Sequence, residues 1–80
     1  MDSQHDDAAP IDLYLTRLSK MTDQQIMDEC VFHEHVMERG FKDKGQKIRA
    51  KQAFEAAASR PSLDSEKEML LTAVRVLRLL

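Results

Sequence analysis

The sequence is poor in cysteine, glycine and aromatic residues, and each shortage argues against a class of protein. Its only cysteine, Cys30, cannot form an internal disulfide, whereas small secreted domains usually contain several. Two glycines are too few for a phosphate-binding loop. One tyrosine, three phenylalanines and no tryptophan argue against a base-stacking surface for single-stranded nucleic acid. The cysteine content indicates a reducing compartment, and we expect a cytoplasmic protein.

Long hydrophobic runs and a basic start are also lacking. No apolar stretch approaches the ~18 residues of a membrane-spanning helix, so we expect no membrane association. The first seven residues are acidic, unlike the basic start of a secretory signal. Residues 1–9 are polar and unpatterned, which predicts a flexible acidic tail. The remaining residues 10–80 are enough for one domain only.

Apolar residues recur at helical spacing through most of residues 10–80. Strand-like alternation and the Asn-Gly or Asp-Gly turns of hairpins are missing. This pattern predicts an all-α fold, a small antiparallel bundle of three to four helices in a single domain. The helices are expected at about residues 10–20, 22–39, 43–59 and 62–80.

Capping signals support these boundaries. Thr22 and Gln25 form a capping-box pattern, and Gly40 suits a left-handed stop at the end of that helix. Asp43 is placed to cap the third helix, which should end before Pro61. Ser65 begins a second capping-box pattern for the last helix.

The third and fourth helices differ in their apolar faces. The face of the third consists of alanines around a single large residue, Phe54, which predicts close approach of another helix. The fourth has more large apolar residues than contact with one neighbour requires. Two interpretations follow: the fourth helix is the centre of the bundle, or it also contacts a second chain. We expect a homodimer, with these partner-binding residues: Leu70, Leu71, Val74, Leu77, Arg75 and Arg78.

Charge is segregated along the chain. Residues 22–40 have a net charge of -4 and residues 41–60 a net charge of +4, within a total of -2. The simpler interpretation is that the acidic and basic helices neutralise each other across a short turn. The alternative is a bipolar surface that orients a partner.

A basic segment at residues 42–52 gives the alternative function. Its candidate phosphate-contacting residues are Lys44, Lys47, Arg49 and Lys51. They could lie on a recognition helix of a nucleic-acid-binding transcriptional regulator, with Gln46, Arg49 and Gln52 reading bases. The negative net charge of the whole chain argues against it, because DNA-binding domains are usually basic.

The segment around Cys30 and His33 is the closest approach to a chemical site. His33 and His35 point to opposite sides of a helix and cannot share a metal, and no second Cys/His cluster supplies further ligands. His33 lies in the middle of an apolar arc, which favours a buried histidine bonded to a neighbour such as Glu29. A metal or redox sensor built on Cys30 and His33 is a third possibility.

No motif for nucleophilic catalysis or phosphate binding is present. We therefore expect a non-catalytic protein without cofactor or metal. The sequence favours a small protein–protein interaction module, a regulator or inhibitor that binds a larger protein through residues 62–80 and neighbouring charged faces.

Overall fold

The computed structural model describes residues 11–80, with side chains from Leu13 onward. Its elements are α1 (Ile11–Ser19), α2 (Asp23–Arg39), α3 (Lys44–Ala58), a 3₁₀ helix η2 (Pro61–Glu66) and α4 (Lys67–Leu79). Residues 11–80 contain no strand, and the predicted all-α bundle is confirmed. The expectations for the acidic tail and for Pro10 fall outside the described residues.

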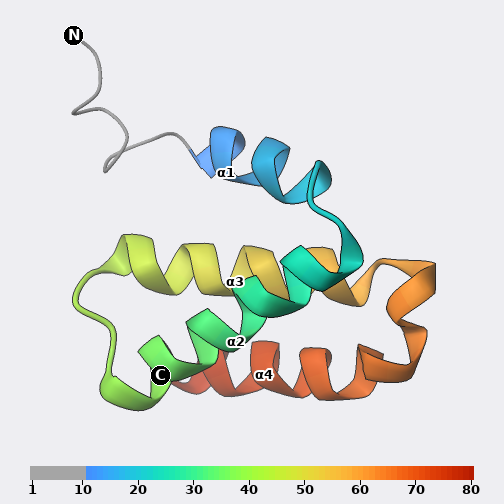
Figure 1. The fold of residues 1–80 in the computed structure, drawn as a ribbon. Coiled ribbons are helices and arrows are strands. Elements are labelled where there is room, and N and C mark those ends of the chain that lie inside the picture. Colours follow the sequence, from blue (N-terminus) through green and yellow to red (C-terminus); the bar gives the residue numbers. More distant parts are fainter. Residues whose placement is uncertain (1–10) are drawn as a thin grey trace, which may run out of the picture.

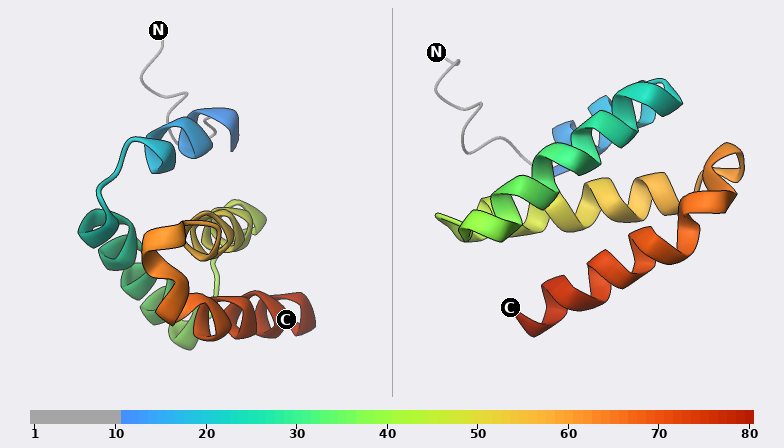
Figure 2. Two further views of the ribbon diagram at one scale, coloured as in Figure 1. Left: turned by 90° about the vertical axis from the view of Figure 1, so that its right-hand side faces the viewer. Right: turned by 60° about the horizontal axis from the view of Figure 1, so that its bottom comes forward.

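The third helix, α3, is the centre of the bundle. It contacts α1, α2 and α4 (Figure 1). Two further views show the same arrangement, with α1 and α4 on opposite sides of α3 and α2 crossing it (Figure 2). The interpretation that residues 62–80 form the central helix is therefore wrong.

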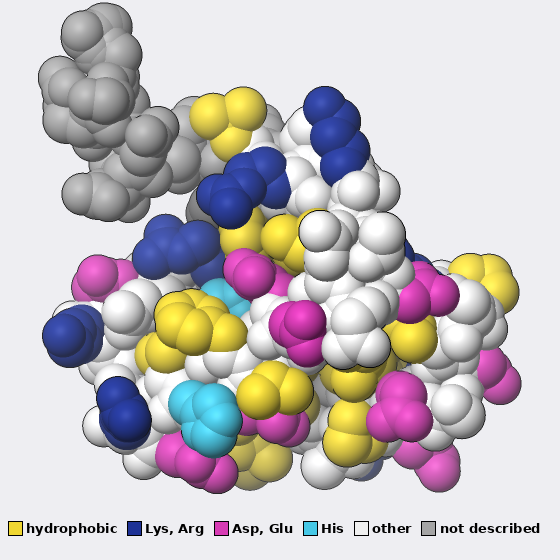
Figure 3. Space-filling view, viewed as in Figure 1, with side chains coloured by type: hydrophobic (Ala, Val, Ile, Leu, Met, Phe, Trp, Pro, Cys, Tyr) yellow, Lys and Arg dark blue, Asp and Glu magenta, His cyan; other side chains and the backbone are white. Residues whose placement is uncertain are grey.

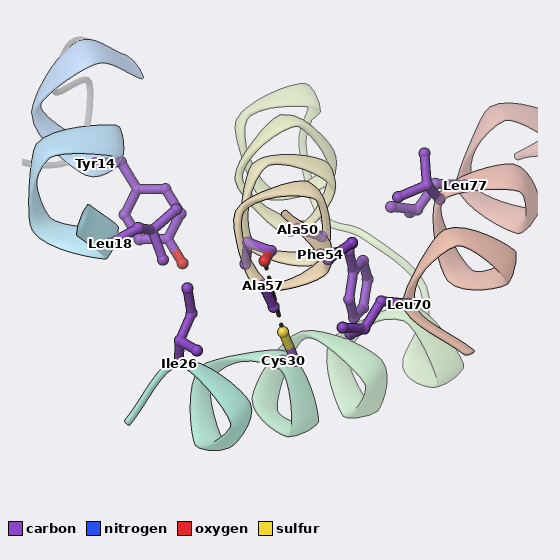
Figure 4. Packing of buried hydrophobic residues seen from close by; sticks show 12 residues of the cluster. Tyr14, Leu18, Ile26, Cys30, Ala50, Phe54, Ala57, Leu70 and Leu77 are labelled. Carbon is purple, nitrogen blue, oxygen red and sulfur yellow. Dashed lines mark hydrogen bonds between the residues drawn. The ribbon is translucent and has the colours of Figure 1, made fainter. Parts of the chain in front are cut away.

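Alanine explains why α3 takes this place. Its face contains the fully buried Ala50, Ala53 and Ala57, and these short side chains let neighbouring helices pack closely. Phe54 is its only large core residue and is also fully buried. Leu70 of α4 lies beside it, whereas Leu18 and Ile26 belong to the same core cluster on the other side of α3 (Figure 4).

Local capping fixes the start of α2, the end of α2 and the start of α3. The Thr22 hydroxyl accepts from the Gln25 amide at 3.1 Å, and the Gln25 side chain accepts from the Thr22 amide at 2.9 Å. This completes the predicted capping box. Asp43 caps α3 by accepting from the Gln46 amide at 2.8 Å. Gly40 has a positive φ of 95°, as expected, but its ψ of 136° lies outside the left-handed helical region.

The start of α4 differs from the expectation. Residues 61–66 form a 3₁₀ turn interrupted by Leu63 at φ -110°, ψ 24°. Ser65 therefore lies inside η2 and does not cap the helix. Glu66 is the N-cap residue and makes no capping bond through its side chain. The predicted box fails because the chain turns through η2 before α4 begins.

Arg60 ties three segments together at one end of the bundle. Its guanidinium donates to the Asp23 carboxylate at 3.0 Å and to the Leu18 carbonyl at 2.9 Å. Hydrogen bonds from Ser62 and Arg60 lower the pKa of Asp23. The end of α1 and the start of α2 are thereby held against the segment that follows α3.

Candidate functional site

The structure divides the six predicted partner-binding residues into two groups. Leu70, Val74 and Leu77 are 1, 4 and 1% exposed and belong to the core of the chain itself. They cannot contact a partner while the bundle is closed, so their place in the predicted seam is corrected. Leu71, Arg75 and Arg78 are exposed.

Other apolar residues of α4 are exposed instead. Met69, Val76, Leu79 and Leu80 are 47, 41, 87 and 64% exposed, and we call them the α4 strip. At about 100° per residue they lie along one side of the helix. The surplus of apolar residues in the sequence was the correct signal. Sequence reasoning missed this side because it assigned the seam to the face that packs on α3.

The side of α4 on which the strip lies can be inferred from the residues on the other side of the helix. Leu71 and Lys67 line a shallow pocket of about 480 Å³ together with residues of α3, including Glu55 and Ala58. Met69, Val76 and Leu80 lie about 140–200° around the helix from Leu71. They therefore face away from that pocket, toward the side of α4 on which α2 crosses the bundle (Figure 2).

The neighbouring edge of α2 carries two glutamates beside the exposed Val31. Glu29 accepts a hydrogen bond from Tyr14 of α1, so this edge of α2 faces α1. Glu34 and Glu38 lie about 140–180° around α2 from Glu29 and so occupy the opposite edge, toward α4. In Figure 3 hydrophobic side chains alternate with acidic ones over the half of the molecule formed by α2 and α4.

Tyr14, Glu29 and His33 form a buried polar network between α1 and α2. The Tyr14 hydroxyl donates to Glu29 Oε2 at 2.6 Å and lies 2.7 Å from His33 Nε2. A hydroxyl has a single hydrogen, so here the Nε2–H of His33 donates to the tyrosine oxygen. The prediction that His33 is a buried histidine bonded to a neighbour is confirmed, but the closest partner is Tyr14, and Glu29 Oε2 is 3.8 Å away.

The surroundings of His33 favour its neutral imidazole form. Burial lowers the pKa of His33, the Glu29 carboxylate raises it in part, and Arg49 lowers it. Burial and the hydrogen bond to Glu29 raise the pKa of the Tyr14 hydroxyl. The folded protein thus favours the uncharged forms of His33 and Tyr14. This is what we expect of a structural contact between helices.

We expect the protein to become less stable as the pH decreases, because of His33. Its pKa is lower in the folded state than the ~6.5 of an unfolded histidine, so the unfolded chain binds more protons below that pH. The contribution of His33 to the free energy of unfolding should be constant above about pH 7 and decrease as the pH falls through about 6.5. Urea denaturation at several pH values should show this slope.

Two histidine variants test the assignment. His33→Gln should remove the slope between about pH 7 and 5.5, because glutamine does not titrate. His35→Gln removes an exposed histidine of the same helix and should leave the slope in place. An unchanged slope in His33→Gln would contradict the assignment.

Cys30 is placed for packing. It is 2% exposed, and its Sγ lies 3.6 Å from the Ala53 carbonyl oxygen (Figure 4). Burial raises the pKa of its thiol to about 12, and a protonated, buried thiol is a poor nucleophile and metal ligand. Within the described part of the chain, no three or more His, Cys, Asp or Glu side chains are placed to hold a metal ion.

The four candidate phosphate-contacting residues differ in exposure. Lys44 and Lys51 are exposed, whereas Lys47 and Arg49 are half-buried, and Arg49 acts electrostatically on His33. The other expected base-reading residues are engaged in the fold. Gln46 Oε1 accepts from the Lys42 amide at 2.7 Å, and Gln52 Oε1 is buried. Because α3 packs on three helices, only its solvent-facing side is available for contact with nucleic acid.

The acidic residues of α2 and the basic residues 42–51 are not joined by direct ion pairs in the described part of the chain. Among residues 13–80, no ion pair joins an acidic residue of α2 to a cation of residues 42–51. In Figure 3 the Lys and Arg side chains gather on one side and the acidic ones mostly on the other. Neutralisation through direct ion pairs is therefore not seen in this part of the chain, and the bipolar surface stays a prediction.

A second hollow, of about 610 Å³, lies between α1 and α3. It combines apolar residues such as Leu15 and Met21 with Gln52, whose Oε1 has no hydrogen-bond partner among the described residues. Its charged lining residues are Glu55 and Arg60, and the Arg60 guanidinium is already bonded to Asp23 and to the Leu18 carbonyl. Its chemistry is therefore less distinctive than that of the α4 strip.

Comparison with known proteins found no matching family model, curated protein or solved structure. None of the helices in residues 11–80 is long and apolar enough to span a membrane. The candidate site therefore rests on geometry alone. Its main feature is the exposed α4 strip.

Proposed function

We propose that this chain is a non-catalytic protein–protein interaction module of the cytoplasm that regulates or inhibits a larger protein. The observation that carries the proposal is the α4 strip, four large apolar side chains exposed on one helix after the core is complete. The reduced, buried Cys30 supports a reducing compartment.

The surroundings of the strip match the anatomy of an interface. Interfaces combine an apolar centre with a polar, charged rim. Here Arg75 lies on one edge of α4, and Glu34 and Glu38 lie on the neighbouring edge of α2. Complete burial of a side chain such as Leu79 contributes about 1.5–3 kcal/mol, so a partner that covers the strip gains a substantial part of its binding energy there.

The test is strip-dependent capture of a partner. The triple variant Met69→Ser, Val76→Ser and Leu80→Ser should retain the fold, because these side chains lie outside the core, and should lose a stoichiometric protein that the parent chain captures from host lysate. The matched control, Leu13→Ser with Leu15→Ser, removes two exposed leucines of α1 and should retain the partner. Equal loss in both variants would contradict the proposal.

A second candidate function is nucleic-acid binding by the solvent-facing side of α3. The observation in its favour is that Lys44 and Lys51 are exposed and make no ion pair with α2. Capture that disappears after nuclease treatment, weakens steeply with salt and is lost in Lys44→Glu with Lys51→Glu would establish it in place of the first proposal.

A further inference from the structure

We infer that the α4 strip is covered by a second copy of this chain, in a two-fold dimer whose α4 helices lie side by side and point in the same direction. The inference rests on the proposed function and names one partner for its surface. Its basis is that, at the level of Arg75, the two edges of the strip carry opposite charge, so this part of the surface is complementary to itself; Glu68 lies on the Arg75 edge about two turns earlier.

The two edges are assigned by helix geometry. Arg75 immediately precedes Val76 and lies on the edge of α4 that faces away from α2. Glu34 and Glu38 lie on the other side of the strip, on the edge of α2 opposite the Tyr14–Glu29 contact. The carboxyl-terminal ends of α2 and α4 lie at the same end of the bundle (Figure 1). The arginine and the two glutamates are therefore at a similar level along the strip.

Spacing along α4 gives the seam of such a dimer. Met69, Thr72, Val76 and Leu79 alternate at three and four residues, which is the spacing of core positions in paired helices. Thr72 is exposed, and its small side chain allows close approach of a second helix. In this register Arg75 flanks the seam on one side and Leu80 on the other.

Charge selects the direction of the paired helices. If the helices ran in opposite directions, Met69 would pair with Leu79 and Thr72 with Val76, and the same flanks would meet. Arg75 of one copy would then lie beside Arg75 of the other. With the helices parallel, opposite flanks meet, so that Arg75 of each copy lies toward Glu34 and Glu38 of the other. Like charges at an interface are strongly unfavourable, which favours the parallel arrangement.

A charge-swap series measured by sedimentation equilibrium tests the pairing. Arg75→Glu should weaken dimerisation by roughly tenfold or more, and so should Glu34→Arg with Glu38→Arg. The triple variant that combines all three changes should restore the dimer. Arg78→Glu lies on the side of Leu71, away from the strip, and is the matched control that should leave the dissociation constant unchanged.

Disulfide cross-linking tests the direction independently. In a Cys30→Ala background, Leu79→Cys should form a dimer between identical positions under mild oxidation. A mixture of Met69→Cys and Leu79→Cys chains should form no preferential cross-link between the two. Preferential cross-linking of position 69 to position 79 would overturn the parallel arrangement.

The two proposals fail in different ways. A parent chain that is monomeric at all concentrations, or a dimer that is unaffected by Arg75→Glu, overturns the dimer. The proposed interaction function holds even without a dimer if the parent chain captures a different protein from lysate and the triple serine variant of the strip does not. A dimer with the expected charge and cross-linking behaviour supports the inference even if no larger partner is found.

Discussion

Replacing Phe54 with alanine should lower the free energy of unfolding by about 3–5 kcal/mol. Phe54 is fully buried and is the only large core side chain of the central helix. Its α3 neighbours in the core, Ala50, Ala53 and Ala57, are too small to fill the space that it would leave. The other helices would have to move toward α3 to close the cavity, and each of them packs against α3 independently.

The size of this effect matters because the domain is small. Native domains unfold with only about 5–15 kcal/mol, and a chain of this length is expected at the lower end. Urea denaturation followed by circular dichroism should show a much lower midpoint for Phe54→Ala. Phe32→Ala removes the same side chain where it is 57% exposed and should cost far less. Equal losses in the two variants would contradict the central role of α3.

The elements that could be predicted are those whose causes are local. Thr22 and Gln25 complete a capping box because both partners lie within one helical turn. The alanine face of α3 could be identified because apolar residues at helical spacing leave only one side to bury. Ser65 shows the limit of this approach, because its capping pattern is present but residues 61–66 turn as a 3₁₀ helix.

The candidate site was less predictable because it depends on how the helices pack. Position on an apolar arc was enough to bury His33. It could not identify Tyr14 as the partner, because the two residues are 19 positions apart and meet only when α1 docks on α2. The separation of charge could be predicted from composition. The absence of pairing between α2 and residues 42–51 depends on the angle between helices.

The strip on α4 illustrates the same limit. Apolar residues cover so much of this helix that the sequence is compatible with several choices of buried face. Packing against α3 determines which face is buried. Leu70, Val74 and Leu77 lie in the core, and the α4 strip stays exposed. A surplus of apolar residues therefore predicts that an interface exists on a helix, whereas the residues that form it depend on the neighbouring elements.

Leu77→Glu should abolish the folded state, which is the largest effect that we expect from a single substitution in α4. Leu77 is 1% exposed and belongs to the hydrophobic core, where a carboxylate would be buried among apolar side chains. An unpaired buried charge costs several kcal/mol, and the packing of the leucine is lost as well. Together these losses are comparable to the whole stability of a small domain.

Leu79→Glu is the matched control, because it makes the same change two residues away at a position that is 87% exposed. Circular dichroism should show helical signal and a cooperative thermal transition for Leu79→Glu but not for Leu77→Glu. Sedimentation of Leu79→Glu should show weaker self-association. A folded, monomeric Leu77→Glu protein would contradict this assignment, because it would place Leu77 at an interface between chains. The pair of variants thus separates the face of α4 that builds the bundle from the face that is available to a partner.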